Sequence, residues 1–335
     1  MTLHSSRLLG YSLIIAFSLF MACTNSESTN PPKTGVLVLA HGSADPTWNN
    51  TVTDVTASLA EQYPLEIAFG MANPYSMQPA IDSLEAKNVD QIVVVPLFVS
   101  SFSPIIRQNE FLLGLRDSLA DAPMPPMAHE MTDEMKSMMA EDMSHKKMTM
   151  DHSGHDMHDS EFTLEPLDIN SKIIFTEPLD DHPLIGEILY ERVEAVSKNP
   201  STETILLVAH GPVKDSDNEK WVSTLENLGE QIRRHQAEHG KEDFYKIISL
   251  TVRDDASEEV YDAAKQEFRS FVKEAGEYGE AIVIPVLLSK GGVERRYLTR
   301  LEGLDYVWGG ETILPHKNVA TFLEQSVSKA LQENK

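Results

Sequence analysis

Short apolar runs alternate with longer amphipathic segments along most of the chain. Two of the runs, residues 36–40 and 205–209, are rich in Val, Leu and Ile, and each is followed directly by a His-Gly pair. Runs of this length and composition are typical of strands buried on both faces of a parallel sheet. The histidines, His41 and His210, then fall at the carboxyl ends of strands, where open α/β sheets bind their ligands.

The alternation of strand and helix runs twice through the chain. In the first half it predicts strands at 36–40, 65–71, 91–99 and 172–176, with helices at 48–62, 78–86, 109–120 and 183–197. In the second half it predicts strands at 205–209, 245–252, 281–288 and 306–309 with 311–314, and helices at 218–236, 257–275 and 319–332. Such alternation gives a parallel sheet covered on both faces. We therefore expect an α/β protein made of two tandem flavodoxin-type βα domains, each with a parallel four-stranded sheet, related by duplication.

The repeat extends to single residues. The matching pairs are His41 with His210, Pro96 with Pro285, and His182 with His316. His182 and His316 each stand where a helix is predicted to begin. Capping or packing is at least as good an interpretation of these two histidines as catalysis.

One segment, residues 121–168, breaks the alternation and has no counterpart in the second half. It holds ten of the fourteen methionines and five of the twelve histidines. Thioether and imidazole groups are ligands for Cu(I), Cu(II), Ni(II) or Co(II), so the insertion predicts a labile metal site, with copper a candidate. Its ligands are Met148, Met150, His152, His155, Met157 and His158. A disordered acidic loop is the alternative interpretation.

The N-terminus has the pattern of a targeting segment. His4 and Arg7 precede an apolar stretch at residues 8–22, which is followed by Cys23, the only cysteine, and then by polar residues. This order resembles a bacterial lipoprotein signal. The resemblance implies a signal peptide at 1–22, a lipidated Cys23 that begins a tether at 23–34, and a periplasm-facing position in the cell envelope, with membrane contact through the lipid anchor only. A plain signal peptide and an uncleaved anchor are the alternatives.

The composition excludes several classes of partner and site. The 335 residues carry a net charge of −24, which argues against a nucleic-acid partner because phosphate binding requires a basic face. A single cysteine excludes an intrachain disulfide and a cysteine-based metal site. The length suffices for two domains of ordinary size.

Three segments in order resemble the sirohydrochlorin chelatase family. They are Val-Leu-Ala-His-Gly-Ser at 38–43, Ile-Val-Val-Val-Pro-Leu-Phe at 92–98 and Asp-His-Pro-Leu-Ile-Gly-Glu-Ile-Leu at 181–189. The resemblance covers about residues 35–331 outside the insertion and matches the two-half form of the family. It implies chelatase-like domains at 35–199 and 200–335, and a class II metal chelatase, a lyase, that inserts Co²⁺, Fe²⁺ or Ni²⁺ as substrate into a tetrapyrrole.

The resemblance also implies site residues. In the family, a histidine after the first strand and a second histidine after the third strand bind the metal and accept pyrrole protons. His41 and His210 match the first role, but neither half has the second histidine, and Ser103 stands near its place in the first half. In the second half Glu294 follows Pro285 as a glutamate does in protoporphyrin ferrochelatases. We therefore expect His210 and Glu294 to form the metal-binding, catalytic pair, with His41 as a second metal-binding and catalytic position.

Nearby polar residues are candidates for holding the carboxylates of a tetrapyrrole. They are Lys290, Arg295, Arg296, Ser43 and Ser103. Guanidinium and ammonium groups bind carboxylates strongly, although ordinary surface charge would give the same pattern.

Two functions remain open at this point. The first is an exported chelatase, which could form a homo-oligomer. The second is a non-catalytic periplasmic protein that binds metal or a tetrapyrrole on the chelatase fold. The second is favoured by the missing histidine after the third strand and by export away from cytoplasmic tetrapyrrole synthesis.

Overall fold

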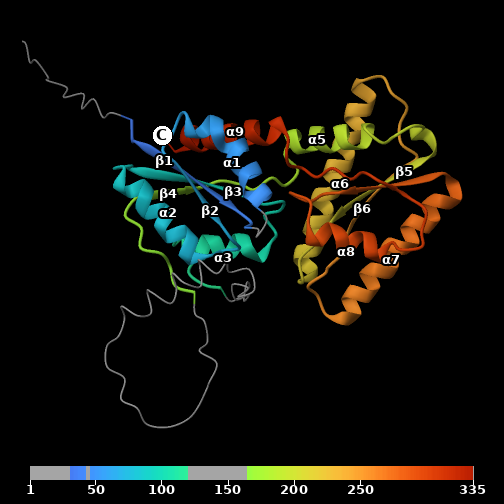
Figure 1. The fold of residues 1–335 in the computed structure, drawn as a ribbon, viewed down its shortest axis with the longest axis horizontal. Helices are drawn as coiled ribbons and strands as arrows, with labels where there is room; N and C mark the ends of the chain where they lie inside the picture. Colours follow the sequence, from blue (N-terminus) through green and yellow to red (C-terminus); the bar gives the residue numbers. More distant parts are fainter. Residues whose placement is uncertain (1–30, 43–45, 120–163, 335) are drawn as a thin grey trace, which may run out of the picture. The chain divides into compact units, whose positions relative to one another are not determined.

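The computed structural model describes residues 31–42, 46–119 and 164–334, which form two βα halves (Figure 1). The first half consists of β1 (Thr34–Ala40), α1 (Pro46–Ala60), β2 (Leu65–Phe69), α2 (Pro74–Ala86), β3 (Gln91–Leu97), α3 (Pro104–Leu112), β4 (Lys172–Phe175) and α5 (Pro183–Glu194). After a short 3-10 turn (Pro200–Thr202), the second half consists of β5 (Glu203–Ala209), α6 (Asp215–Glu238), β6 (Lys246–Thr251), α7 (Glu258–Tyr278), β7 (Glu280–Pro285), α8 (Gly292–Arg300), β8 (Val307–Trp308) and α9 (Lys317–Glu333).

Each half contains one parallel four-stranded sheet. The strand orders are β2-β1-β3-β4 and β6-β5-β7-β8, which are equivalent. The register is also equivalent, because Leu39 of β1 lies opposite Pro96 and Val208 of β5 lies opposite Pro285. The predicted fold class, two parallel four-stranded α/β sheets related by duplication, is therefore confirmed.

The first strand of each half is an inner strand of its sheet. Every residue of β1 and of β5 is buried, as the apolar runs predict. β1 and β5 each have a parallel neighbour on both sides. The residues that follow β1 and β5 therefore lie between the ends of two other strands. This placement puts His41 and His210 at the middle of their sheet edges.

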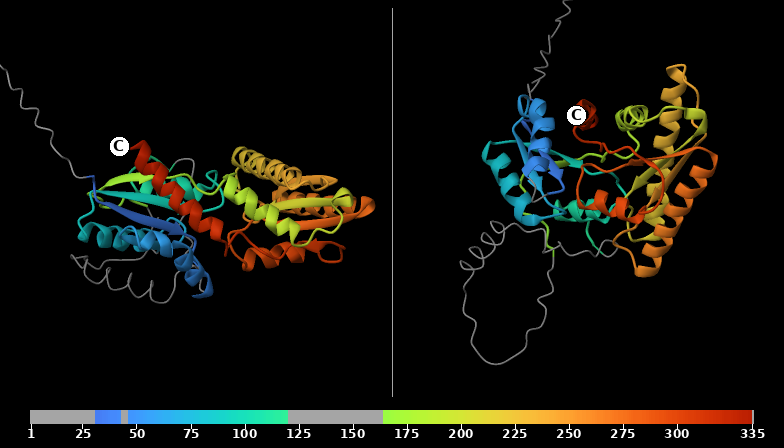
Figure 2. Two further views of the ribbon diagram at one scale, coloured as in Figure 1. Left: turned by 90° about the horizontal axis from the view of Figure 1, so that it is seen from above. Right: turned by 45° about the vertical axis from the view of Figure 1, so that its right-hand side comes forward.

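The last helix of each half packs against the other half. Helix α9 contacts α1 and β3 of the first half, whereas α5 contacts α6 and β7 of the second. Figure 2 shows α9 (red) over the first sheet and α5 (yellow-green) over the second. One hydrophobic core accordingly contains buried side chains from both sheets, including Val38, Val95, Leu207 and Ile284. The predicted boundary between residues 199 and 200 divides the chain between the two sheets. It does not divide the packing, because α5 and α9 each contact the other half.

The two histidines that precede these exchanged helices are caps. The Nδ1 of His182 accepts a hydrogen bond from the Leu184 amide at 3.3 Å, and its ring lies edge-on to Phe322 of α9. The Nδ1 of His316 accepts one from the Asn318 amide at 3.1 Å, and its Nε2 lies 2.9 Å from a carboxylate oxygen of Glu191 in α5. The capping interpretation is confirmed for both, and each cap also joins α5 to α9.

Two helices differ from the sequence prediction. Helix α3 was expected at 109–120 but begins at Pro104, because Ser103 caps it and proline suits a first helical position. Helix α8 was not predicted. Only Tyr297 and Arg300 of α8 are buried, so the segment has almost no apolar periodicity to reveal a helix.

No helix in the described ranges is long and apolar enough to cross a membrane.

We expect His182 to make stability depend on pH. Burial, with the nearby Lys329, lowers the pKa of His182 below its usual value. The folded state therefore binds this proton less readily than the unfolded state, and the stability that neutral His182 contributes is lost as pH falls through the unfolded and then the folded pKa. His182→Asn keeps a capping oxygen that does not titrate. Thermal unfolding measured between about pH 7 and pH 5 should show a smaller decrease in Tm for the variant than for the wild type. Equal decreases would contradict this role.

Candidate active site

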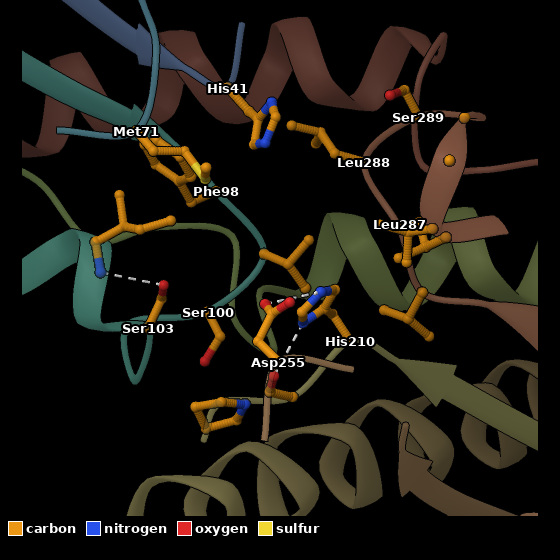
Figure 3. Close-up of a pocket in the computed structure, with 18 of the residues that line it drawn as sticks. His41, Met71, Phe98, Ser100, Ser103, His210, Asp255, Leu287, Leu288 and Ser289 are labelled. Carbon is orange, nitrogen blue, oxygen red and sulfur yellow. Dashed lines mark hydrogen bonds and ion pairs between the residues drawn. The ribbon is translucent and has the colours of Figure 1, made fainter. Parts of the chain in front are cut away.

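His41 and His210 line the same cavity, although they are far apart in the sequence and come from different sheets (Figure 3). The cavity has a volume of about 500 Å³. Its walls come from the segments after β1, β2 and β3 in the first half and after β5, β6 and β7 in the second, together with Trp48 and Trp221. The carboxyl ends of both parallel sheets therefore contribute to one site, as expected for α/β folds.

The two imidazoles have the same local geometry. The Nδ1 atom of His41 lies 2.6 Å from the carbonyl oxygen of Gly42, and the Nδ1 atom of His210 lies 3.0 Å from that of Gly211. A carbonyl oxygen can only accept a hydrogen bond, so in each ring Nδ1 carries the proton. In the neutral ring Nε2 is then the basic nitrogen, which can bind a divalent ion or take a proton.

A carboxylate stands beside His210. Asp255 lies in the segment after β6, and its Oδ2 is 3.4 Å from the Nε2 of His210. Because β6 is the neighbour of β5 in the sheet, the ends of these two strands bring Asp255 and His210 together. The pair offers one nitrogen and one oxygen donor of the kinds that divalent first-row metals accept. The Asp255 side chain is 44% exposed, so ions can reach it from solvent.

The first half has apolar residues in the corresponding places. Met71 follows β2 and Phe98 follows β3, the two strands that flank β1. Both line the cavity, and Figure 3 shows them on the side of His41. Ser103 also lines the cavity, but its Oγ accepts the Ile105 amide at 3.3 Å and caps α3. Among the described residues, the positions after the strands that flank β1 are therefore apolar, whereas the corresponding segment after β6 supplies Asp255 beside His210.

The expected pairing of His210 with Glu294 is not what the structure shows. Glu294 lies in the first turn of α8, does not line the cavity, and accepts a hydrogen bond from the indole of Trp308 at 3.3 Å. We expected Glu294 in a loop beside His210, but α8, which was not predicted, places its side chain outside the cavity lining. Asp255 stands where we expected Glu294. The sequence contains a signal for Asp255. Two adjacent acids, Asp254 and Asp255, follow the strand predicted at 245–252, and this strand lies beside the strand that ends before His210.

Of the three basic residues predicted to contact a substrate, Lys290 and Arg296 line the cavity. Lys290 forms an ion pair with Glu311 at 2.8 Å, which holds the pKa of that carboxyl below its usual value. The Nε of Arg296 lies 3.0 Å from Oδ2 of the buried Asp254. Arg295 is exposed and does not line the cavity.

A buried ion pair joins the two halves next to the cavity. The guanidinium of Arg107 in α3 donates to Asp217 in α6 at 2.7 Å, and the side chains are 12% and 8% exposed. Gln108, the next residue of α3, lines the cavity. Because loss of one partner would leave a buried charge unpaired, this pair holds α3 and α6 at a fixed distance across the site.

Some predicted residues lie outside the described ranges. They are Ser43, Cys23, and the insertion residues Met148, Met150, His152, His155, Met157 and His158. Their roles stay predictions from the sequence. Within the described ranges, no group of three or more His, Cys, Asp or Glu side chains is placed to hold a metal ion.

Comparison with known proteins points to one family. Residues 35–102 match the family model described as CbiX. A sirohydrochlorin cobaltochelatase from Methanothermobacter thermautotrophicus is 27% identical over 174 residues, which are 51% of this chain and 98% of that protein. Another from Saccharolobus solfataricus is 34% identical over 82 residues, 24% of this chain and 64% of that protein. The chain is therefore similar to the sirohydrochlorin chelatase family.

A solved structure extends the likeness of fold to both halves of the chain. It is SirB from Bacillus subtilis with Fe³⁺, which has a TM-score of 0.52, 14% sequence identity, and a match covering 89% of this chain and 96% of that one. At such identity the match concerns the fold alone. The two similar proteins from Methanothermobacter and Saccharolobus are both named as metal chelatases.

The two His-Gly pairs should respond differently to substitution of their glycines. Gly211 has φ +74, and a Cβ there would lie 2.5 Å from the Cβ of Thr251. Gly42 has no such constraint, since the nearest atom to a Cβ would be at 3.4 Å. Gly211→Ala should therefore lower the free energy of unfolding by about 2 kcal/mol, and Gly42→Ala by less than about 1 kcal/mol. Urea unfolding of both variants checks this, and equal effects would contradict it.

Proposed function

We propose that this protein inserts a divalent metal ion, Co²⁺ in the first place, into a free-base tetrapyrrole of the sirohydrochlorin class in the cavity between the two halves. One observation carries the proposal: His41 and His210, at the ends of equivalent strands, line one cavity. The similarity to the family and the names of the relatives support the reaction type. Fe²⁺ and Ni²⁺ are the other metals that an imidazole–carboxylate donor set suits.

The reaction requires bases more than it requires a permanent metal ligand. A divalent ion replaces two N–H protons of the macrocycle, so one ion is consumed and two protons are released for each ring. His210 and Asp255 lie 3.4 Å apart and can bind the ion through Nε2 and a carboxylate oxygen. As the ion moves to the ring nitrogens, the same two groups become free to accept a proton. A base held within reach of the reacting proton contributes typically 10²–10⁴-fold to a rate.

The Asp255 carboxylate also gives the released protons a way out of the cavity. Because this carboxylate is 44% exposed, it can pass a proton on to water.

The apolar side of the cavity suits the macrocycle itself. Met71, Phe98 and Leu288 present side chains without charge along the wall, and aromatic rings bury well against such groups. His41 on this side adds a second imidazole whose basic nitrogen is Nε2. We assign His41 to the opposite side of the ring from the His210–Asp255 pair, so that the pair supplies the metal and then accepts one of the two protons while His41 accepts the other.

The test is the rate of Co²⁺ insertion into sirohydrochlorin, followed by absorbance with the purified protein. We expect a rate well above the spontaneous rate. His210→Ala and Asp255→Asn should each lower kcat by about 10²-fold, and His41→Ala should lower it as well. Asp305→Asn is the matched control, because Asp305 is an exposed carboxylate away from the cavity.

The outcome also separates the two functions left open by the sequence. A wild-type rate equal to the spontaneous rate, unchanged by His210→Ala, would rule out the enzyme. If Co²⁺ or the tetrapyrrole then still bound, with weaker binding in His210→Ala, the protein would be a carrier on the chelatase fold.

We also propose that the protein faces the periplasm and is anchored in the cell envelope through a lipid on Cys23. The support is the order of charged, apolar and polar residues around this only cysteine. In a bacterial host, the wild type should fractionate with membranes and incorporate labelled fatty acid, whereas Cys23→Ser should not incorporate it. Label in the Cys23→Ser variant would contradict the anchor.

A further inference from the structure

We propose that Arg253 is a positioning residue for the metal site. It ties the segment after β5, which begins with His210, to the turn after β6, which carries Asp255 (Figure 3). This inference rests on the proposed function, in which His210 and Asp255 bind the incoming ion, and it specifies what holds the two donors 3.4 Å apart. Arg253 does not line the cavity, so it acts through these two residues and does not touch the substrate.

The backbone of Arg253 contacts His210 directly. Its amide donates to the carbonyl oxygen of His210 at 2.8 Å. Arg253 has φ +51, in the left-handed region that few residues with a side chain adopt, and the chain turns here, since the amide of Ala256 donates to the Arg253 carbonyl at 3.2 Å. Asp254 and Asp255 are the two central residues of this turn. The position of Asp255 is therefore set by the place at which Arg253 is held.

The side chain of Arg253 reaches the segment that continues from His210. Its guanidinium donates to the carbonyl oxygen of Pro212 at 3.1 Å and to that of Val213, and it forms an ion pair with Asp215 at 2.7 Å. The Arg253 side chain is 11% exposed, so little water competes for its donors. A planar guanidinium has its donors in a fixed arrangement and therefore also fixes the acceptors that it meets. The backbone and the side chain of one residue thus hold both segments.

Helix α8 holds the same turn from its other side. Arg300, which is buried, donates to the carbonyl oxygen of Val252 at 2.7 Å and to Oδ1 of Asp254. Asp254 is 1% exposed, whereas Asp255 is 44% exposed and lies beside His210. The two acids of the turn therefore differ in role, because Asp254 anchors the turn and leaves Asp255 at the cavity.

The equivalent position in the first half holds a methionine. Strands β2 and β6 occupy equivalent places in their sheets and end at residues 69 and 251, so Met71 and Arg253 both lie two residues beyond a strand end. A thioether has no hydrogen to donate to a carbonyl oxygen, and the carbonyl oxygen of His41 accepts a hydrogen bond from the indole of Trp48 instead. The first half thus ties its strand end to α1, whereas the second half ties it to the turn that carries Asp255. Arg253→Met gives the second half the residue of the first.

The Co²⁺ affinity of the cavity tests this, measured by titration calorimetry on the full chain at a temperature where each variant is folded. The insertion is itself predicted to bind metal, so the share of the cavity is the part of the titration that His210→Ala removes. Arg253→Met should weaken this part by about tenfold or more, as the loss of groups that orient metal ligands does. Asp255→Asn should cost at least as much, because it removes a ligand. Arg253→Lys keeps the charge without the fixed fork of donors and should recover part of the loss.

Combining two substitutions distinguishes positioning from a general loss of stability. If Arg253 acts through Asp255, adding Asp255→Asn to Arg253→Met should weaken Co²⁺ binding by less than about threefold, whereas independent effects would multiply. Arg233→Met is the matched control, because Arg233 donates to the carboxylate of Asp243 at 2.6 Å and to the carbonyl of Phe244 at 3.2 Å and does not line the cavity. It should change the Co²⁺ affinity by less than about twofold and leave the effect of Asp255→Asn at its full size.

The outcomes separate this inference from the proposed function. Multiplying effects of Arg253→Met and Asp255→Asn would overturn the inference, as would the affinity of the wild type in Arg253→Met. Either result would leave Co²⁺ insertion and its dependence on His210 and Asp255 intact. If Arg253→Met did not fold, Arg253→Lys would decide, since a wild-type affinity in that variant would mean that the fork of donors is not required. If His210→Ala and Asp255→Asn removed no Co²⁺ binding, the metal-binding pair of the proposed function would fail together with the inference.

Discussion

The exchange of α5 and α9 between the two halves is the constraint on which the site depends. Each helix covers the sheet of the other half, and both contribute to one hydrophobic core. The caps at His182 and His316 join the two helices to each other, and Arg107 with Asp217 joins α3 to α6. These contacts fix the two sheet edges against one another. Without them His41 and His210 would belong to two separate shallow edges rather than to one cavity.

Within this fixed frame, the chemistry is divided unequally. The positions after the flanking strands hold Met71 and Phe98 in the first half, but Asp255 and a leucine pair in the second. The same backbone plan thus presents an apolar wall on one side and an imidazole–carboxylate pair on the other. A metal ion is attracted to the second side and a flat, largely apolar macrocycle to the first, so both reactants can be held in one volume of about 500 Å³.

The sequence was sufficient for the features that depend on neighbouring residues. Buried strands show as unbroken apolar runs, and the His-Gly pairs mark their ends, so both sheets and both histidines could be predicted. Asp255 could have been predicted, because parallel neighbours end at the same edge, but the resemblance to protoporphyrin ferrochelatases after Pro285 favoured Glu294. The expected position of Glu294 was wrong because this residue lies in α8. That helix has only two buried residues, too few for its sequence to show a helical pattern. The helix exchange could not be predicted, since it depends on contacts between segments more than 100 residues apart, such as His316 with Glu191.

The exchanged helices also bear on how a duplicated protein can change over time. Two copies that fold separately can each be lost or replaced, so each must keep its own complete site to be retained. When each copy supplies a helix to the other's core, neither copy can be discarded, whatever happens at its strand ends. The residues at the strand ends of each copy can then change separately. The unequal cavity of this chain is what such mutual dependence permits, because the two halves of a duplicated fold supply two unlike walls of a single site.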